Sequence, residues 1–159
     1  MNKCYSCFNE YEDNIQICPF CGEEITSDPK EPVHLIPGTI LADRYVIGRA
    51  VGAGGFGIIY NAWDKKLDTI VAVKEFFAGR LVTRAAKTKD VIINKKSQAE
   101  FQYRKARFLA EARNMAKFGA HRSIPNVFEF FEDNNTAYIV MELLHGVGLN
   151  HYLRNNGGN

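Results

Sequence analysis

Glycine and lysine residues near the middle of the chain have the types and spacing that suit phosphate binding. Gly52, Gly54, Gly55 and Gly57 lie within six positions, and Lys74 follows on an apolar stretch. Glycine allows a backbone to lie close over a triphosphate and to adopt positive φ without steric cost. A lysine beyond such a loop would neutralise phosphate oxygens.

The residues after the last glycine exclude two other glycine-rich phosphate sites. A dinucleotide-binding fold begins a helix at its third glycine, and a Walker-type loop places Lys and Ser or Thr directly after its last glycine. Here Ile58, Ile59 and Tyr60 follow, and such residues favour a strand. The glycines therefore predict the turn of a β-hairpin, with Phe56 at its tip.

A third strand is predicted from Ile70 to Phe76, after a turn at residues 65–69. Alternation along this strand places Ala72 and Lys74 on one face. Ala72 is small enough to cover an adenine, and Lys74 would then bind phosphate. The alternative for Lys74 is a surface lysine that keeps its charge in water.

A helix that could hold an acid against Lys74 is predicted from about Ser97. Ser97 and Glu100 fit a capping box. An apolar stripe follows at helical spacing, formed by Phe101, Phe108, Ala112, Met115 and Ala116. Glu111 lies beside this stripe, where a carboxylate is costly unless it is paired, so Lys74 is its predicted partner. The alternative is an exposed carboxylate that pairs with an arginine of its own helix.

Four motifs occur in order: the glycine hairpin, the lysine strand, the helical segment Arg107–Arg113 and the run Tyr138–Gly146. Together they closely resemble the small lobe of bacterial Hanks-type serine/threonine kinases, from about Gly38 to Leu149. The resemblance implies an α+β fold, with a five-stranded antiparallel sheet and one major helix, helix C. Residues 126–132 and 136–142 form the last two strands, joined by an Asp-Asn-Asn turn.

The resemblance also implies a set of site residues for ATP with magnesium. Lys74 and Glu111 take the catalytic positions, and Met141 takes the gatekeeper position between them and the hinge. The backbone of Glu142 and Leu144 would meet the adenine. The residues implied for nucleotide contact are Val51, Gly52, Gly54, Gly55, Phe56, Gly57, Ile59, Ala72, Lys74, Met141, Glu142 and Leu144.

Two motifs of the family do not occur in this sequence. They are the H-R-D-x-x-x-x-N loop, which supplies the base and one magnesium ligand, and the D-F-G aspartate. His121-Arg122-Ser123 has serine in place of the aspartate and precedes the hinge strand. We therefore expect an N-terminal kinase fragment that is inactive alone, with residues 150–159 as the cut start of the large lobe.

The resemblance implies that the parent transfers the γ-phosphoryl of ATP to a protein serine or threonine. Its partners would be a protein substrate, the missing large lobe and further copies of the chain, docked through the exposed inter-lobe face. One alternative is a non-catalytic regulator that binds nucleotide or a partner. Another is an interaction module at the N-terminus for which the lobe is only a scaffold.

All four cysteines lie in two C-x-x-C pairs at the start of the chain, Cys4 with Cys7 and Cys18 with Cys21. Four thiolates suit tetrahedral zinc, and the pattern resembles a compact zinc ribbon over residues 1–24 with a closed, structural site. A disulfide or a redox pair is the alternative, but no signal peptide or βαβ pattern accompanies the cysteines. A cytoplasmic protein is therefore expected, with a linker at 25–38 and the lobe at 39–149.

The net charge of +2 hides an asymmetry. Residues 1–32 carry seven acids against two lysines, whereas residues 76–107 carry nine Lys or Arg against two acids. Nucleic acid would be repelled by such an acidic ribbon. The basic stretch, which includes Arg84, Lys87 and Lys89, is expected to be a solvated excursion, or else to dock on the acidic ribbon. No apolar run is long enough for a membrane span.

Overall fold

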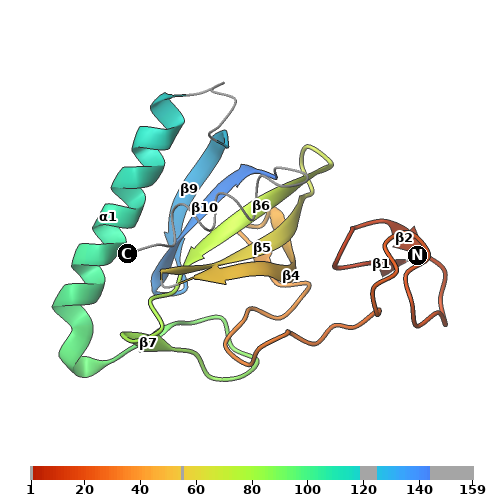
Figure 1. The fold of residues 1–159 in the computed structure, drawn as a ribbon, viewed down its shortest axis with the longest axis horizontal. Coiled ribbons are helices and arrows are strands. Elements are labelled where there is room, and N and C mark those ends of the chain that lie inside the picture. Colours follow the sequence, from red (N-terminus) through yellow and green to blue (C-terminus); the bar gives the residue numbers. More distant parts are fainter. Residues whose placement is uncertain (1, 55, 119–124, 144–159) are drawn as a thin grey trace.

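The glycine-rich segment forms the hairpin that its sequence predicts, and this hairpin is the first half of a curled antiparallel sheet (Figure 1). The computed structural model describes residues 2–54, 56–118 and 125–143. Its sheet has the order β3-β4-β5-β6-β10-β9. The strands are β3 (Ile40–Leu41), β4 (Tyr45–Gly54), β5 (Gly57–Asp64), β6 (Thr69–Phe76), β9 (Val127–Asp133) and β10 (Thr136–Glu142).

The sheet contains the five predicted strands and one more. β3 is only two residues long and pairs with the start of β4, so it extends the edge of the sheet. The turn between β9 and β10 contains Asn134 and Asn135, with φ of 52° and 61°. Asparagine tolerates this left-handed backbone better than most residues, and two such residues in succession suit a tight hairpin.

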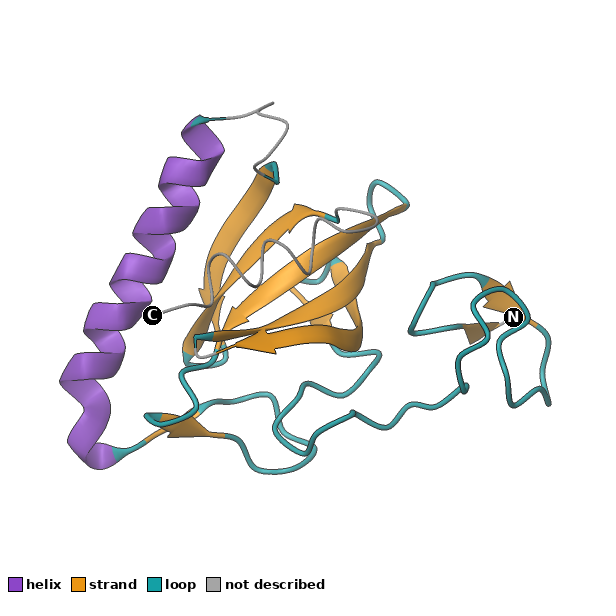
Figure 2. Cartoon of the chain, viewed as in Figure 1, coloured by secondary structure: helices purple, strands orange, loops and turns teal. Residues whose placement is uncertain are grey.

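The inner face of the curled sheet forms the core of the lobe. Tyr60, Val73 and Tyr138 alternate onto this face from three neighbouring strands, and all three are fully buried. The opposite face of β6 packs against α1 (Gln98–Lys117), which runs along one side of the sheet (Figure 2). Phe76 contacts two aromatic rings of this helix, Phe101 and Phe108, with centroids 5.2 and 5.3 Å away.

The start of α1 differs from the prediction in its capping. Ser97 is the N-cap residue but makes no side-chain capping hydrogen bond, so the capping box is not formed. Glu100 instead pairs with Arg104 one turn later, at 2.7 Å. The apolar stripe is also shorter than predicted, because Ala116 is exposed and only the part up to Ala112 is buried.

The segment between β6 and α1 is not simply solvated, which corrects the prediction for Arg84. Lys87 and Lys89 are exposed, but Arg84 is buried and pairs with Glu75 at 2.5 Å. Neither side chain of this pair has any exposed surface. Burial raises the pKa of the Glu75 carboxyl, and the Arg84 guanidinium opposes that rise. In the sequence, Arg84 is one of several basic residues in a polar segment. It can be buried because it pairs with an acid in the core.

Arg84 also joins two distant parts of the chain to the core. Its guanidinium donates to the carbonyls of Val33 and Lys89. Nearby, the Leu35 N–H donates to the Tyr60 hydroxyl, which in turn donates to Glu75. Residues 33–35 therefore pack as part of the lobe, although they lie in the predicted linker. The short hairpin of β7 (Val82–Thr83) and β8 (Ile92–Ile93) shapes the rest of this segment.

The N-terminal part of the chain is a small module around the four cysteines. Its strands β1 (Asn2–Lys3) and β2 (Glu10–Tyr11) pair antiparallel, and an isolated bridge joins Ile17 to Glu24. The helix of the described part of the chain is not long and apolar enough to cross a membrane. The predicted boundaries at residues 24, 38 and 149 stay predictions.

The buried ion pair leads to a test of stability. We expect Arg84→Met to lower the free energy of unfolding by about 3–5 kcal/mol, because Glu75 would be left buried without its counter-charge. Urea unfolding followed by the fluorescence of Trp63, the single tryptophan, measures this change. The exposed Lys95→Met serves as the control and should change the value by less than about 0.5 kcal/mol.

Adding Glu75→Leu to Arg84→Met should recover part of the loss, because an apolar pair avoids the unpaired charge. A double variant that is as unstable as the sum of the two single variants would contradict this role for the pair.

Candidate functional site

The two glycines at the ends of the hairpin turn differ in whether the fold itself requires them. A Cβ on Gly57 would lie 2.8 Å from the Glu75 carbonyl oxygen and 3.3 Å from Cε of Lys74. The protein itself therefore demands glycine at position 57. A Cβ on Gly54 would meet nothing within 4 Å, and its φ is not left-handed. The fold does not demand glycine there, and this leaves the space over Gly54 free for a ligand.

The face of the sheet beneath the hairpin carries the side chains expected for a nucleotide site. Strand register places Lys74 opposite Ile59 of β5, on the same face. Two residues along, Ala72 pairs with Met141 of β10. One basic and three apolar side chains thus share a face across three strands. Such a surface can hold an aromatic base at one end and a phosphate at the other.

Lys74 combines partial burial with a nearby opposite charge. Burial lowers the pKa of its ammonium, and the carboxylate of Glu111 raises it again in part. The Lys74 Nζ lies 5.8 Å from the ring centroid of Phe108 on α1. Glu111 itself is exposed on this helix, not at the core edge as the stripe suggested. The structure thus brings the predicted pair close enough for an electrostatic effect.

The other predicted contact residues are distributed around this face. Val51 and Phe56 are exposed near the hairpin turn, and Phe56 lies under the Arg104 guanidinium at 5.4 Å. Gly52 pairs with Ile59 in the hairpin register. Glu142 ends β10, and its N–H donates to the Asn126 carbonyl. Gly55 and Leu144 lie outside the described residues, as do residues 121–123 and 150–159.

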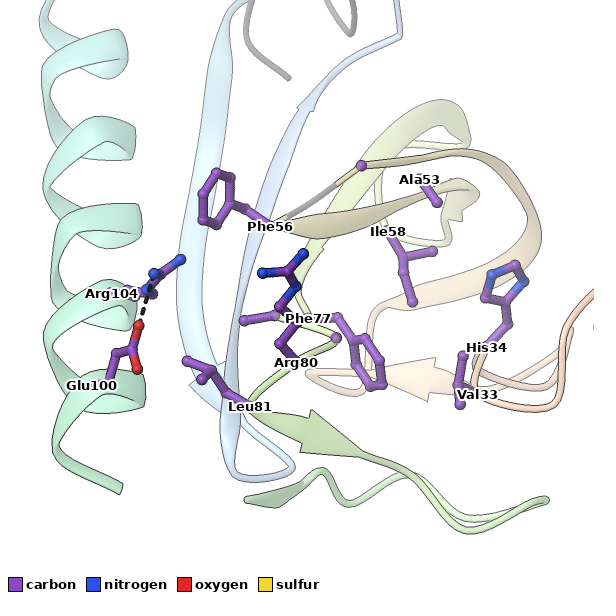
Figure 3. A pocket seen from close by; sticks show the side chains of 13 residues that line it. Val33, His34, Ala53, Phe56, Ile58, Phe77, Arg80, Leu81, Glu100 and Arg104 are labelled. Atoms are coloured by element: carbon purple, nitrogen blue, oxygen red, sulfur yellow. Dashed lines mark hydrogen bonds and ion pairs between the residues drawn. The ribbon is translucent and has the colours of Figure 1, made fainter. Parts of the chain in front are cut away.

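A hollow of about 790 Å³ lies beside the hairpin turn and is lined by Gly54, Phe56 and Ile58 and by Glu100 and Arg104 of α1 (Figure 3). Ile58 lines it and, as the neighbour of Ile59 in the strand, points to the opposite face from Lys74. The predicted linker contributes His34, whose pKa burial lowers. Lys74, Ala72 and Met141 do not line this hollow, so it differs from the face that these three residues share.

The comparisons with known proteins agree with this geometry. A family model described as the protein kinase domain matches residues 45–158. The chain belongs to the protein kinase family. A probable serine/threonine-protein kinase of Clostridium acetobutylicum is 33% identical over 120 residues, covering 76% of this chain and 15% of that protein. Serine/threonine-protein kinase PknA of Mycobacterium tuberculosis is 30% identical and is covered to 25%.

A solved structure shares the fold of the kinase lobe as well. The structure titled "PpkA-294 apo form" aligns with a TM-score of 0.69 at 30% identity, and the alignment covers 77% of this chain and 43% of that one. The chain spans a quarter or less of the length of these two curated relatives. The match supports the predicted α+β small lobe.

The four cysteines ahead of the kinase lobe converge on one point. Their Sγ atoms all lie within 4.8 Å of one another, and none forms a disulfide. The pairs Cys4–Cys21 and Cys7–Cys18 each have sulfurs 3.7 Å apart. Four sulfurs at about 2.3 Å from a tetrahedral zinc are about 3.8 Å apart, so the donor set and its size fit zinc.

The two C-x-x-C knuckles have the same backbone pattern. In the first, the Phe8 N–H donates to the Cys4 carbonyl at 2.7 Å; in the second, the Gly22 N–H donates to the Cys18 carbonyl at 2.9 Å. Both Phe8 and Gly22 have positive φ, at 59° and 76°. These tight turns direct N–H groups towards the sulfurs, for example from Ser6 to Cys4.

The knuckles affect the acidity of the thiols in different directions. Burial raises the pKa of Cys4, and it raises that of Cys21 to about 12. Burial acts upward on Cys18 too, but the N–H groups of Cys21 and Phe20 outweigh it and lower its pKa to about 7. A thiol of this kind loses its proton readily, as a metal ligand must.

Sequence reasoning missed the buried pair of Glu75 and Arg84. The signal for Glu75 was available, because Glu75 follows Lys74 on a strand with buried neighbours and must lie on the opposite face. A carboxylate on a core face needs a cation. Which of the many basic residues supplied it could not be read from the sequence, since the partner comes from a segment without periodicity.

The glycines of the hairpin give a matched pair of variants. We expect Gly57→Ala to lower the free energy of unfolding by about 1–3 kcal/mol, because the new methyl group collides with a backbone carbonyl of β6. Gly54→Ala should change it by less than about 0.5 kcal/mol, as should the exposed control Gly79→Ala. Urea unfolding measures all three, and equal effects at positions 54 and 57 would refute the steric distinction.

Proposed function

We propose that this chain supplies the ATP-binding half of a serine/threonine kinase, which transfers the γ-phosphoryl group of ATP to a protein hydroxyl. The observation that carries the proposal is the shared face of Lys74, Ile59, Ala72 and Met141 beneath the glycine hairpin. Membership of the protein kinase family supports it. ATP, bound with magnesium, supplies the reactive phosphoryl group.

The residues of this chain would bind and orient the nucleotide. The backbone of the hairpin turn lies over the phosphates, and the open space above Gly54 suits their approach. Lys74 neutralises phosphate charge, and Glu111 keeps its ammonium in place and protonated. Ala72 and Met141 cover one side of the adenine, together with Val51 and Ile59, while the backbone beyond Met141 reads its edge.

The proposal covers nucleotide binding and positioning. The base and the magnesium ligands of this family lie in motifs that these 159 residues do not contain. A protein substrate and a large lobe are therefore proposed partners. Self-association through the inter-lobe face remains a further proposal. The alternative of a regulator without a catalytic parent is less favoured, because the matched relatives are named as kinases.

For the four-cysteine module we propose one structural zinc ion held by Cys4, Cys7, Cys18 and Cys21. The spacing of the sulfurs supports this ion, and four thiolates leave no open position for catalysis. The unpaired thiols favour a reducing compartment, and we propose the cytoplasm.

Nucleotide binding is tested by titrating the chain with ATP and magnesium in a calorimeter. We expect saturable binding that weakens about tenfold or more in Lys74→Met, because a charge-assisted contact contributes about 1.5–3 kcal/mol. Lys66→Met, in the exposed turn after β5, is the matched control and should bind like the parent chain. Gly54→Ala should also bind ATP more weakly, despite its unchanged stability.

Equal binding by Lys74→Met and Lys66→Met would contradict the assignment of the site. If neither the parent chain nor any variant binds ATP, then this chain alone does not bind nucleotide.

Zinc binding is tested by metal analysis and by competition with a chromogenic chelator. We expect one zinc per chain, and loss of that zinc in Cys18→Ser because the oxygen ligand is harder and less readily ionised. Ser6→Ala lies between two of the ligands but changes no sulfur, so it should retain the metal. Zinc retained by Cys18→Ser at the parent affinity would refute the four-thiolate site.

A further inference from the structure

The first strand of the hairpin, β4, is interrupted where the four-cysteine module touches it. The register between β4 and β5 shifts between Ile47 and Ala50, and again between Ala50 and Gly52. Arg49 falls in this irregular segment, and its N–H donates to the Tyr5 carbonyl of the first knuckle at 3.0 Å. A bulge removes a residue from the ladder, and here the module accepts the hydrogen bond of that residue.

A second polar contact places the module on the nucleotide face of the sheet. The Asn61 side chain donates to the Ser6 carbonyl at 2.6 Å. Asn61 lies directly opposite Ala72 in the register of β5 and β6, so the two side chains share a face. The module therefore covers the sheet beyond the adenine end of the proposed site, and does not dock on the basic segment after β6.

Charged groups surround these two contacts. Arg49 Nη1 lies 3.6 Å from Oε2 of Glu23 in the second knuckle. The Lys3 ammonium lies 4.4 Å from the ring centroid of Trp63 on β5. Both knuckles and the β1 strand thus contact the β4–β5 pair, which fixes the orientation of the module as well as its position.

The contact between the module and β4 leaves no room for a side chain at position 48. A Cβ at position 48 would lie 2.3 Å from the Tyr5 carbonyl oxygen, 2.8 Å from Cζ of Phe8 and 2.9 Å from the Asn61 carbonyl oxygen of β5. Real Cβ atoms do not approach so closely, so any larger residue would separate the module from β4. Gly38 also lies against the module, since an added Cβ would be 2.7 Å from the Tyr5 hydroxyl, but there the positive φ of 95° is what requires glycine.

Phe8 shows that the module, too, is adapted to the contact. It takes the left-handed position that Gly22 occupies in the other knuckle. A residue with a Cβ is strained in this conformation, whereas glycine adopts this backbone freely. Phe8 is nonetheless only 6% exposed, and its ring lies against Gly48. The unfavourable backbone is therefore compensated by the contact with the lobe.

We propose that the first knuckle is a positioning element for the glycine hairpin, and that metal occupancy of the module sets the order of that hairpin and hence its nucleotide affinity. The module has too few residues for a core of its own and depends on its metal to fold. The contact at Arg49 lies only two residues before Val51. The link to nucleotide affinity rests on the proposed nucleotide site and the dependence on metal rests on the proposed zinc site, whereas the contact of the first knuckle with β4 rests on neither.

Hydrogen–deuterium exchange of the hairpin amides, residues 50–58, tests the proposal directly. In the zinc-loaded chain we expect Phe8→Gly to keep its metal and to raise exchange at these amides about tenfold, because the local opening free energy falls. Phe20→Ala is the matched control, since it removes an exposed aromatic ring from the other knuckle. Its hairpin should exchange at the parent rate.

A second variant and a metal-free sample keep the test valid if Phe8→Gly does not fold. Gly48→Ala acts from the lobe side and leaves every residue of the module unchanged. Because its methyl group would also meet the Asn61 carbonyl of β5, faster exchange in this variant supports the proposal only when zinc removal from it adds no further increase. Removing zinc from the parent chain with a chelator should also speed exchange at residues 50–58, with exchange at β9 and β10 unchanged. Unaltered hairpin exchange in zinc-loaded Gly48→Ala, or after chelation, would overturn the proposal.

ATP titration of the same proteins separates this inference from the proposed function. Faster hairpin exchange together with weaker ATP binding supports both. Faster exchange in a chain whose parent binds no ATP keeps the positioning role and removes only the nucleotide-binding function.

Discussion

The lobe depends on the burial of one carboxylate, that of Glu75. Glu75 and Lys74 are neighbours on the central strand β6, so their side chains point to opposite faces of the sheet. A shift of register by one residue would place the lysine in the core and the carboxylate in the cleft. Because Arg84 stabilises Glu75 only on the core side, the ion pair specifies the register and thereby the orientation of Lys74. The position of the Lys74 ammonium is thus set from the other side of the sheet.

The N-terminal half of the sheet is positioned by contacts at two places. At one end, Gly57 allows the hairpin to lie directly against the Glu75 backbone and the Lys74 stem. At the other, the first knuckle of the four-cysteine module contacts β4 at Gly48 and Arg49. The segment between these contacts contains the residues that would touch phosphate. Both contacts require glycine for a steric reason, and the intervening Gly54 does not.

Much of this arrangement could be predicted from local patterns. The hairpin, the strand of Lys74, the long helix and the Asn-Asn turn all follow from residue preferences and spacing, and the strand and helix ranges agree within a few residues. The burial of Arg84 could not be predicted, since it depends on a contact with a strand nine residues earlier in a segment without periodicity. The docking of Phe8 on Gly48 was equally hidden, because two residues forty positions apart become complementary only after both parts fold.

The hydrogen bonds of Arg84 and Tyr60 also determine where the folded lobe begins in the sequence. The family model matches from Tyr45, yet the Val33 carbonyl accepts from Arg84 and the Leu35 N–H donates to Tyr60. A chain started at Tyr45 would expose the inner end of the curled sheet and leave a buried guanidinium short of an acceptor. The range matched by the family model and the folded lobe therefore have different first residues, and the lobe begins at least a dozen positions earlier.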